Sequence, residues 1–171
     1  IGLALRKMRR YEEARTALRE ALSLYRQVDG PQRSQANCLY NTVLVLRDTK
    51  RYQEARTALR EALELYRQVD GSQRDQANCL YNTGLVLRDT ERYQEARTAY
   101  QEALDLYRQI DNTLWDQVDC LNRIGFVTRK MGRHEETRTA YQHALELYRQ
   151  MKGTERQQAN CLNSIANVLD D

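Results

Sequence analysis

The sequence has 171 residues, enough for one domain of ordinary size or one array of small repeats. Its 27 Lys and Arg residues against 24 Asp and Glu residues leave a net charge of +3, which does not by itself supply the concentrated basic surface that nucleic-acid binding usually needs. A single Pro argues against a turn-rich β fold and favours long helices. The sequence shows no apolar run near the roughly 18 residues of a membrane span and no signal-peptide pattern. We therefore expect an all-α protein that binds neither nucleic acid nor a membrane.

The sequence repeats itself with a period of 41 residues. The segment QANCLYNT at 35–42 recurs at 76–83 and returns in altered form at 117–124 and 158–165. A second block, RYEEARTALREALSLYRQVDG, begins at Arg10 and recurs from Arg51, Arg92 and Arg133. Such a period is typical of a solenoid, in which each unit buries its apolar face against its neighbours.

In chain order, the repeat predicts a partial helix over 1–9 and then successive units at 10–50, 51–91, 92–132 and 133–171, the last one incomplete. From Tyr52 to Val69, apolar residues follow i, i+3, i+4, i+7 spacing, which predicts one long amphipathic helix. A shorter stripe with small residues, Ala77 to Leu87, predicts a second helix. The other units repeat both. Because Ile1 corresponds to Thr42, we expect a single array that begins in the middle of a helix and is a fragment of a longer solenoid.

The residues between these helices carry end signals of unequal strength. Gly71 is suited to the left-handed conformation that follows a helix end. Ser72 with Asp75, Thr113 with Asp116 and Thr154 with Gln157 resemble capping boxes, and Pro31 is suited to a first helical position. The breaks at 48–51 and 89–92 contain neither Gly nor Pro. Thr49 and Thr90 are candidate caps there, but the residues alone leave one continuous helix open.

The block Gly84, Leu87, Tyr93, Ala96, Tyr100 and Ala103 resembles the tetratricopeptide signature. A 41-residue unit without a proline after the long helix is similar to the repeats of kinesin light chains and of the sensor arrays behind signalling nucleotide-binding ATPases. The resemblance covers the whole chain. It implies that the breaks are real and that the chain is a right-handed α-solenoid of antiparallel helix pairs. The short-stripe helix of each pair is called helix A and the long-stripe helix is called helix B.

The resemblance also implies a binding surface, because helix A lines the concave wall in this family. The predicted wall residues are Asn37, Tyr40, Arg47, Asn78, Tyr81, Arg88, Asn122, Phe126, Arg129 and Asn163. Arg6 begins the arginine row and Asp170 closes it. Asn side chains can bond to a peptide backbone and Arg grips carboxylates, so we expect a protein-interaction scaffold for an extended, acidic peptide.

Other interpretations stay open. Asp48 and Asp89 can neutralise the arginines that precede them, and Tyr40 and Tyr81 can pack across the groove. Trp115, where the other units have arginine, is either a partner contact or a staple for its loop. The chain can also be a self-assembling module, with end-to-end association, or the ligand-sensing module of a larger signalling ATPase.

The cysteines and histidines suggest no site. Cys38, Cys79, Cys120 and Cys161 recur once per unit, so neighbours should lie about 10 Å apart, beyond the roughly 7 Å between Cα atoms that a disulfide allows. We expect buried thiols in a cytoplasmic protein. His134 replaces a packing tyrosine and His143 is expected in solvent. No catalytic motif is recognised, so we expect no enzyme, metal or cofactor.

Overall fold

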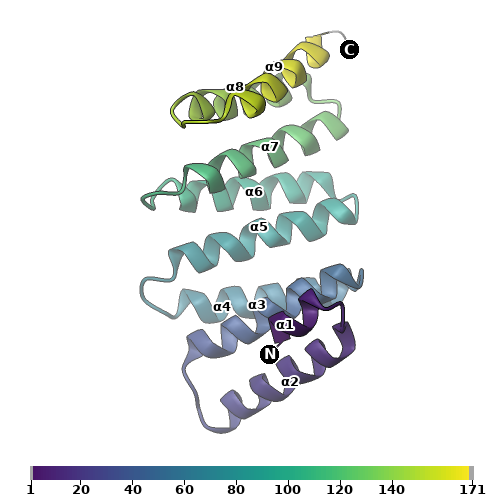
Figure 1. Cartoon of the computed structure of the whole chain (residues 1–171), viewed down its shortest axis with the longest axis vertical. Helices are drawn as coiled ribbons and strands as arrows, with labels where there is room; N and C mark the ends of the chain where they lie inside the picture. The colour runs from purple at the N-terminus through teal and green to yellow at the C-terminus, as the bar shows by residue number, and fades with distance from the viewer. Residues whose placement is uncertain (1, 170–171) are drawn as a thin grey trace. The chain divides into compact units, whose positions relative to one another are not determined.

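The computed structural model describes residues 2–169, so Ile1, Asp170 and Asp171 lie outside it. Nine helices and no strand are found in this range (Figure 1). The prediction of an all-α chain with one short helix and eight long ones is confirmed. The helices are α1 (Gly2–Lys7), α2 (Tyr11–Gln27), α3 (Gln32–Asp48), α4 (Tyr52–Arg67), α5 (Gln73–Asp89), α6 (Tyr93–Tyr107), α7 (Leu114–Lys130), α8 (His134–Arg149) and α9 (Glu155–Leu169).

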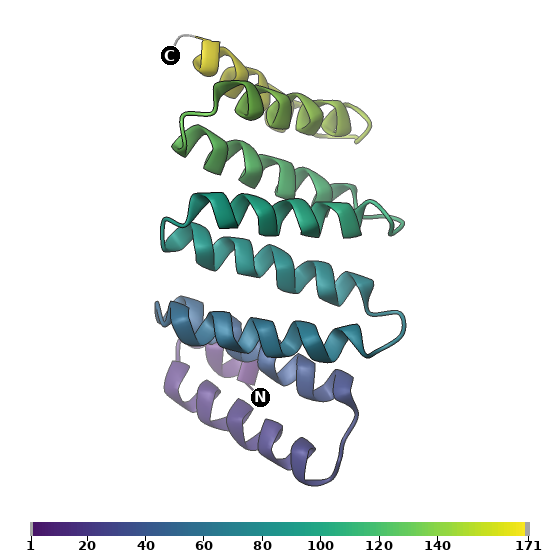
Figure 2. The same cartoon turned by 180° about the vertical axis from the view of Figure 1, so that it is seen from behind.

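The chain forms two compact units, Ile1–Val86 and Leu87–Asp171, whose boundary falls inside α5. In the first unit α3 packs against both α2 and α4, and α1 packs against α2. In the second unit α7 packs against α6 and α8, and α8 also packs against α9. Within each unit successive helices run in opposite directions (Figures 1 and 2). The odd-numbered helices are helices A, and the even-numbered helices are helices B.

Helix A ends at a residue in the left-handed conformation, which creates the break that the residues alone left open. Arg9, Lys50, Glu91 and Gly132 hold this place with φ of 58°, 57°, 59° and 69°. The suggestion that Thr49 caps the next helix is wrong, because its hydroxyl donates back to the Val45 carbonyl over 2.9 Å. The N-cap of α4 is Arg51, without a side-chain cap bond. An ion pair from this arginine to the glutamate three residues on holds the first turn instead, and it recurs as Arg10–Glu13, Arg51–Glu54, Arg92–Glu95 and Arg133–Glu136.

The turn from helix B to helix A is held by a buried hydroxyl. Gly71 has φ 67°, as predicted. The capping-box interpretation of Thr113 is wrong, because Thr113 makes no side-chain cap bond. Its hydroxyl donates backwards to the carbonyls of Tyr107 (2.6 Å) and Ile110 (2.8 Å), and it accepts a bond from Gln117 Nε2 over 3.1 Å. Ser72 with Gln76 and Thr154 with Gln158 repeat this arrangement, so the hydroxyl joins two helices.

Pro31 departs slightly from its predicted place. It is the N-cap of α3, one residue before the first helical position.

The core is a series of thin layers between helices. In α4 the predicted stripe is buried at Ala55, Ala58, Leu59, Ala62 and Tyr66. Helices also approach closely where a residue is small. A Cβ atom built on Gly125 of α7 would lie 2.7 Å from the Tyr141 ring of α8.

The four cysteines are buried and free, as predicted. Burial raises the pKa of each thiol, and it raises the pKa of Cys79 to about 12. Thiols of this kind stay protonated at neutral pH and act as small apolar side chains.

Candidate partner-binding face

The predicted wall residues of the four long helices A, together with Arg6, are called the helix-A face. In the first unit, three of them surround Asn82, which is only 6% exposed. Arg47 Nη1 donates to Asn82 Oδ1 over 2.8 Å, and Asn82 Nδ2 donates to the Tyr40 hydroxyl and to the Asn78 carbonyl, each over 2.9 Å. This network joins α3 to α5. Sequence reasoning missed Asn82, although its recurrence as Asn41 in the QANCLYNT segment was a visible signal.

A buried tyrosine of helix B supports the face from behind. The Tyr66 hydroxyl of α4 donates to Asn37 Oδ1 over 2.5 Å, while the Tyr66 side chain is 1% exposed. Asn37 itself is exposed. Burial raises the pKa of both Tyr66 and Tyr40, so both phenols are neutral at physiological pH. The bond to Tyr66 fixes the direction of an amide that remains accessible.

The arginine row is not uniform. Arg6 Nε pairs with Asp48 Oδ2 over 2.7 Å, and Arg88 pairs with Asp89 over 2.6 Å. Asp89 thus neutralises Arg88, the arginine before it, which is the alternative that the sequence left open. Asp48 instead neutralises Arg6 and leaves Arg47 to Asn82.

Arg129 is the accessible cation of the row. It is exposed, and its side chain makes no hydrogen bond or ion pair with any residue from 2 to 169. Next to it, the Lys130 ammonium lies 5.9 Å from the centroid of the half-buried Phe126 ring. Asp170, the predicted end of the row, lies outside the described residues.

In the second unit an asparagine replaces a tyrosine of the face. Asn122, at the place of Tyr40 and Tyr81, donates to the Tyr148 hydroxyl over 2.9 Å and accepts a bond from Cys161 Sγ over 3.8 Å. A hollow of about 190 Å³ lies beside this group and is lined also by Asn160. Tyr81 is half-buried and Asn163 is exposed.

Trp115 lies near this group but mostly in solvent. It is 55% exposed and packs edge-to-face on Tyr148, with ring centroids 6.1 Å apart. Its ring contact is therefore with α8.

The face can make hydrogen bonds and charge contacts. It presents amides, phenols and a guanidinium. His134 and His143 are both exposed; solvent was predicted for His143, whereas the packing role predicted for His134 is wrong. The described part of the chain holds no group of three or more side chains able to bind a metal ion and no helix able to span a membrane.

Solved structures with the same fold cover nearly all of this chain. BtubC (BKLC) from P. vanneervenii aligns with a TM-score of 0.85 at 14% identity, over 99% of this chain and 69% of its own. The apo form of RapI aligns with a TM-score of 0.85 at 17% identity, and this chain spans 60% of it. The nearly identical TPR-like repeats of a putative kinesin light chain from Podospora anserina align with a TM-score of 0.82 at 9% identity, over 99% of this chain and 82% of theirs. At these identities the likeness establishes the fold alone.

Sequence comparison establishes the family. No curated protein matches the chain. The tetratricopeptide repeat profile, however, matches residues 1–68, 43–109 and 117–171, which together span nearly the whole chain. The chain therefore belongs to the tetratricopeptide repeat family and is a scaffold for protein–protein interaction.

Proposed function

We propose that the helix-A face binds an extended, acidic peptide segment of a partner protein. The observation that carries this proposal is Arg129, a cation of the face that is exposed and has no ion-pair partner among residues 2–169. A planar guanidinium in this state can accept a carboxylate in a two-bond geometry. Lys130 adds a second positive charge, and Phe126 adds flat apolar area beside it.

The asparagines of the face supply the contacts that do not depend on sequence. An amide can donate to and accept from the backbone of an extended chain. Asn37 and Asn163 are exposed, and Asn37 is held by its bond from Tyr66. Holding a side chain in place before binding reduces the entropy lost on association. Within the second unit, the face offers Asn163 for backbone contacts and Arg129 as its charged anchor.

Capture of partners from a matched lysate tests the proposal. The test variant carries Arg129→Glu and Lys130→Glu. The control carries Arg149→Glu and Lys152→Glu, which change the charge equally at two other exposed positions of the same unit. We expect a protein that the native chain and the control retain and that the test variant loses. Its retention should also weaken as salt rises, because salt screens exposed charges. Equal retention by both variants would refute the proposed face.

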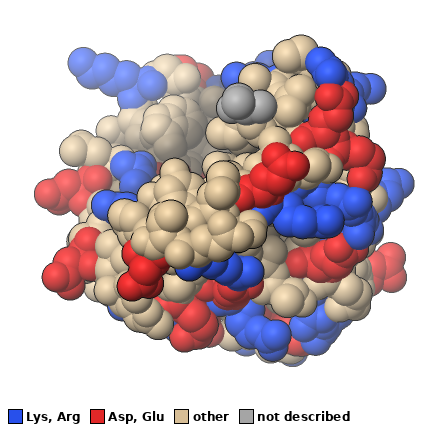
Figure 3. All heavy atoms as spheres, turned by 90° about the horizontal axis from the view of Figure 1, so that it is seen from below, with Lys and Arg blue, Asp and Glu red and all other residues tan. Residues whose placement is uncertain are grey.

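A second candidate function, self-assembly, is favoured by the exposed apolar end of α2. Tyr25 is 37% exposed, whereas Tyr66 at the same place in the next unit is 1% exposed. Leu24 and Val28 are 60% and 72% exposed. Seen from below, uncharged surface lies among interspersed positive and negative side chains (Figure 3).

Sedimentation over a range of protein concentrations tests this candidate. A head-to-tail contact forms open chains whose length grows with concentration. Val28→Glu should abolish that growth if the exposed end of α2 forms the contact. A monomer at every concentration would rule out self-assembly and leave the peptide-binding proposal unaffected.

A further inference from the structure

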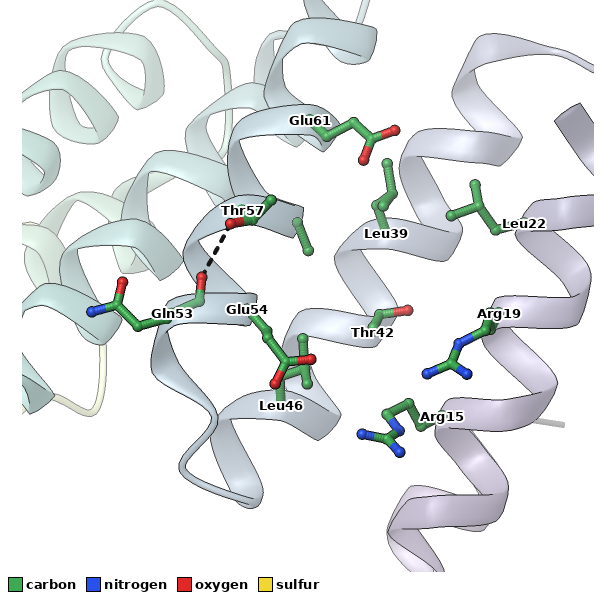
Figure 4. Close-up of a pocket in the computed structure, with 11 residues that line it drawn as sticks. Arg15, Arg19, Leu22, Leu39, Thr42, Leu46, Gln53, Glu54, Thr57 and Glu61 are labelled. Carbon is green, nitrogen blue, oxygen red and sulfur yellow. Dashed lines mark hydrogen bonds between the residues drawn. The ribbon is translucent and has the colours of Figure 1, made fainter.

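A second hollow opens on the other side of α3, between two helices B. It has a volume of about 470 Å³ and is bounded by α2 and α4. Leu39, Thr42 and Leu46 of α3 form its floor. Arg15 and Arg19 line the α2 side, and Glu54 and Glu61 line the α4 side (Figure 4). These seven residues define the α2–α4 groove. None of the seven belongs to the helix-A face.

In the second unit an ion pair crosses the equivalent place. There the two flanking helices B are α6 and α8, and Arg97 of α6 pairs with Glu136 of α8 over 3.1 Å. Arg15 and Glu54 hold the equivalent repeat positions in the first unit. Arg15 pairs instead with Glu12 of its own helix, and Glu54 pairs with Arg51. The difference lies in the arginine: Arg97 bridges two helices B, whereas Arg15 pairs within its own helix. The local pair of Glu54 has its equivalent in Arg133–Glu136.

The groove has hydrogen-bond donors without acceptors, whereas its carboxylates are already in ion pairs. Both acidic residues are already paired, Glu54 with Arg51 and Glu61 with Arg26. On the α2 side, Arg15 Nε and Nη1 are buried and have no hydrogen-bond partner. Arg19 is exposed and makes no ion pair with any described residue. The exposed guanidinium of Arg19 is the donor that a carboxylate entering the groove can reach directly, whereas Arg15 must turn outward to meet one.

We propose that the α2–α4 groove is a second docking site, for a partner segment in which acidic and leucine-like side chains alternate. Arg15 and Arg19 are one helical turn apart, about 6 Å along α2. Alternate residues of an extended strand are about 6.7 Å apart and point to the same side. Two carboxylates so spaced can meet the two guanidinia, while the residues between them point the opposite way, to the α4 side of the groove, where Ala58 and Thr57 line it. This docking does not require the helix-A face.

A synthetic peptide tests the proposal. The probe is acetyl-Glu-Leu-Glu-Leu-Glu-amide, and the control probe has lysine in place of each glutamate. Binding to the full chain is followed by the amide NMR signals. The acidic probe should shift the signals of Leu39, Thr42 and Thr57, and it should leave their counterparts Leu121, Ile124 and Thr139 in place. The lysine probe should shift neither set.

Variants then identify the groups involved. Arg15→Gln with Arg19→Gln should weaken binding of the acidic probe by about tenfold or more. Thr42→Phe should block binding by filling the floor while keeping every charge. Arg138→Gln, at the equivalent position of α8, and Arg129→Glu on the helix-A face should leave binding unchanged. Shifts spread over both units, or equal binding by the Arg15/Arg19 variant, would overturn the proposal.

Discussion

Replacement of Thr113 by valine isolates the buried hydroxyl that joins helix B to helix A. Valine keeps the shape of threonine and removes only the hydroxyl. Thr113 is 1% exposed, and its hydroxyl bonds to two carbonyls and one amide. The Tyr107 carbonyl keeps a bond from the Ile110 backbone N–H. The Ile110 carbonyl and the Gln117 side-chain amide each lose their hydrogen bond with the Thr113 hydroxyl.

The magnitude of the loss depends on these two groups. A buried polar group left without a partner costs about 1–3 kcal/mol, so Thr113→Val should lower the free energy of unfolding by about 2 kcal/mol. In a protein of this size, a loss of about 2 kcal/mol should lower the melting temperature by roughly 4–8 °C. Urea denaturation followed by circular dichroism measures the free energy.

The chain supplies the control itself. Ser72 fills the same place in the preceding unit, so Thr113→Ser should stay close to the native value. A native-like free energy for Thr113→Val, or an equal loss for Thr113→Ser, would refute the role of the hydroxyl.

Three further predictions use the same denaturation assay. Gly125→Ala should lower stability by about 1–3 kcal/mol, although alanine normally favours a helix by about 1 kcal/mol, because its Cβ would meet the Tyr141 ring at 2.7 Å; a more stable variant would contradict the close approach. Cys79 is protonated in the fold up to its raised pKa of about 12 and ionises near pH 8.5 when unfolded, so stability should fall as pH rises between these values. The fall should be shallower in Cys79→Ala, and an identical slope would contradict burial as its cause. Trp115→Ala should cost only about 1 kcal/mol, because the ring is half in solvent; a loss above about 3 kcal/mol would indicate a core role.

Most of the fold could be predicted because one unit repeats. A stripe that recurs every 41 residues is a stronger signal than any single helix pattern, and it indicated the helix number and order. The break after helix A was less visible because Lys50 and Glu91 adopt the left-handed conformation without being glycine. The direction in which the Thr113 hydroxyl donates was also predicted wrongly. The capping-box spacing concerns only the residues after the threonine, whereas the carbonyls that its hydroxyl satisfies come before it in the chain.

The face was harder to predict than the fold. Position in the repeat identified which residues lie on helix A, but it treated the arginines as equivalent. The surroundings of the arginines differ because their partners come from the neighbouring 41-residue repeat, as Asp48 does for Arg6 and Asn82 does for Arg47. The open groove between α2 and α4 was invisible in the sequence. Arg97 bridges to the next helix B, whereas Arg15, at the equivalent repeat position, pairs within its own helix.

Hydrogen–deuterium exchange of the chain, alone and with a partner captured from lysate, tests the central claim most directly. The claim is that the partner is held on the helix-A face by amides and an exposed arginine. The account predicts slower exchange in α3, α7 and α9 when the partner is bound, and no such change with the Arg129→Glu, Lys130→Glu variant. Protection confined to α2, α4, α6 and α8, and unchanged in that variant, would contradict it.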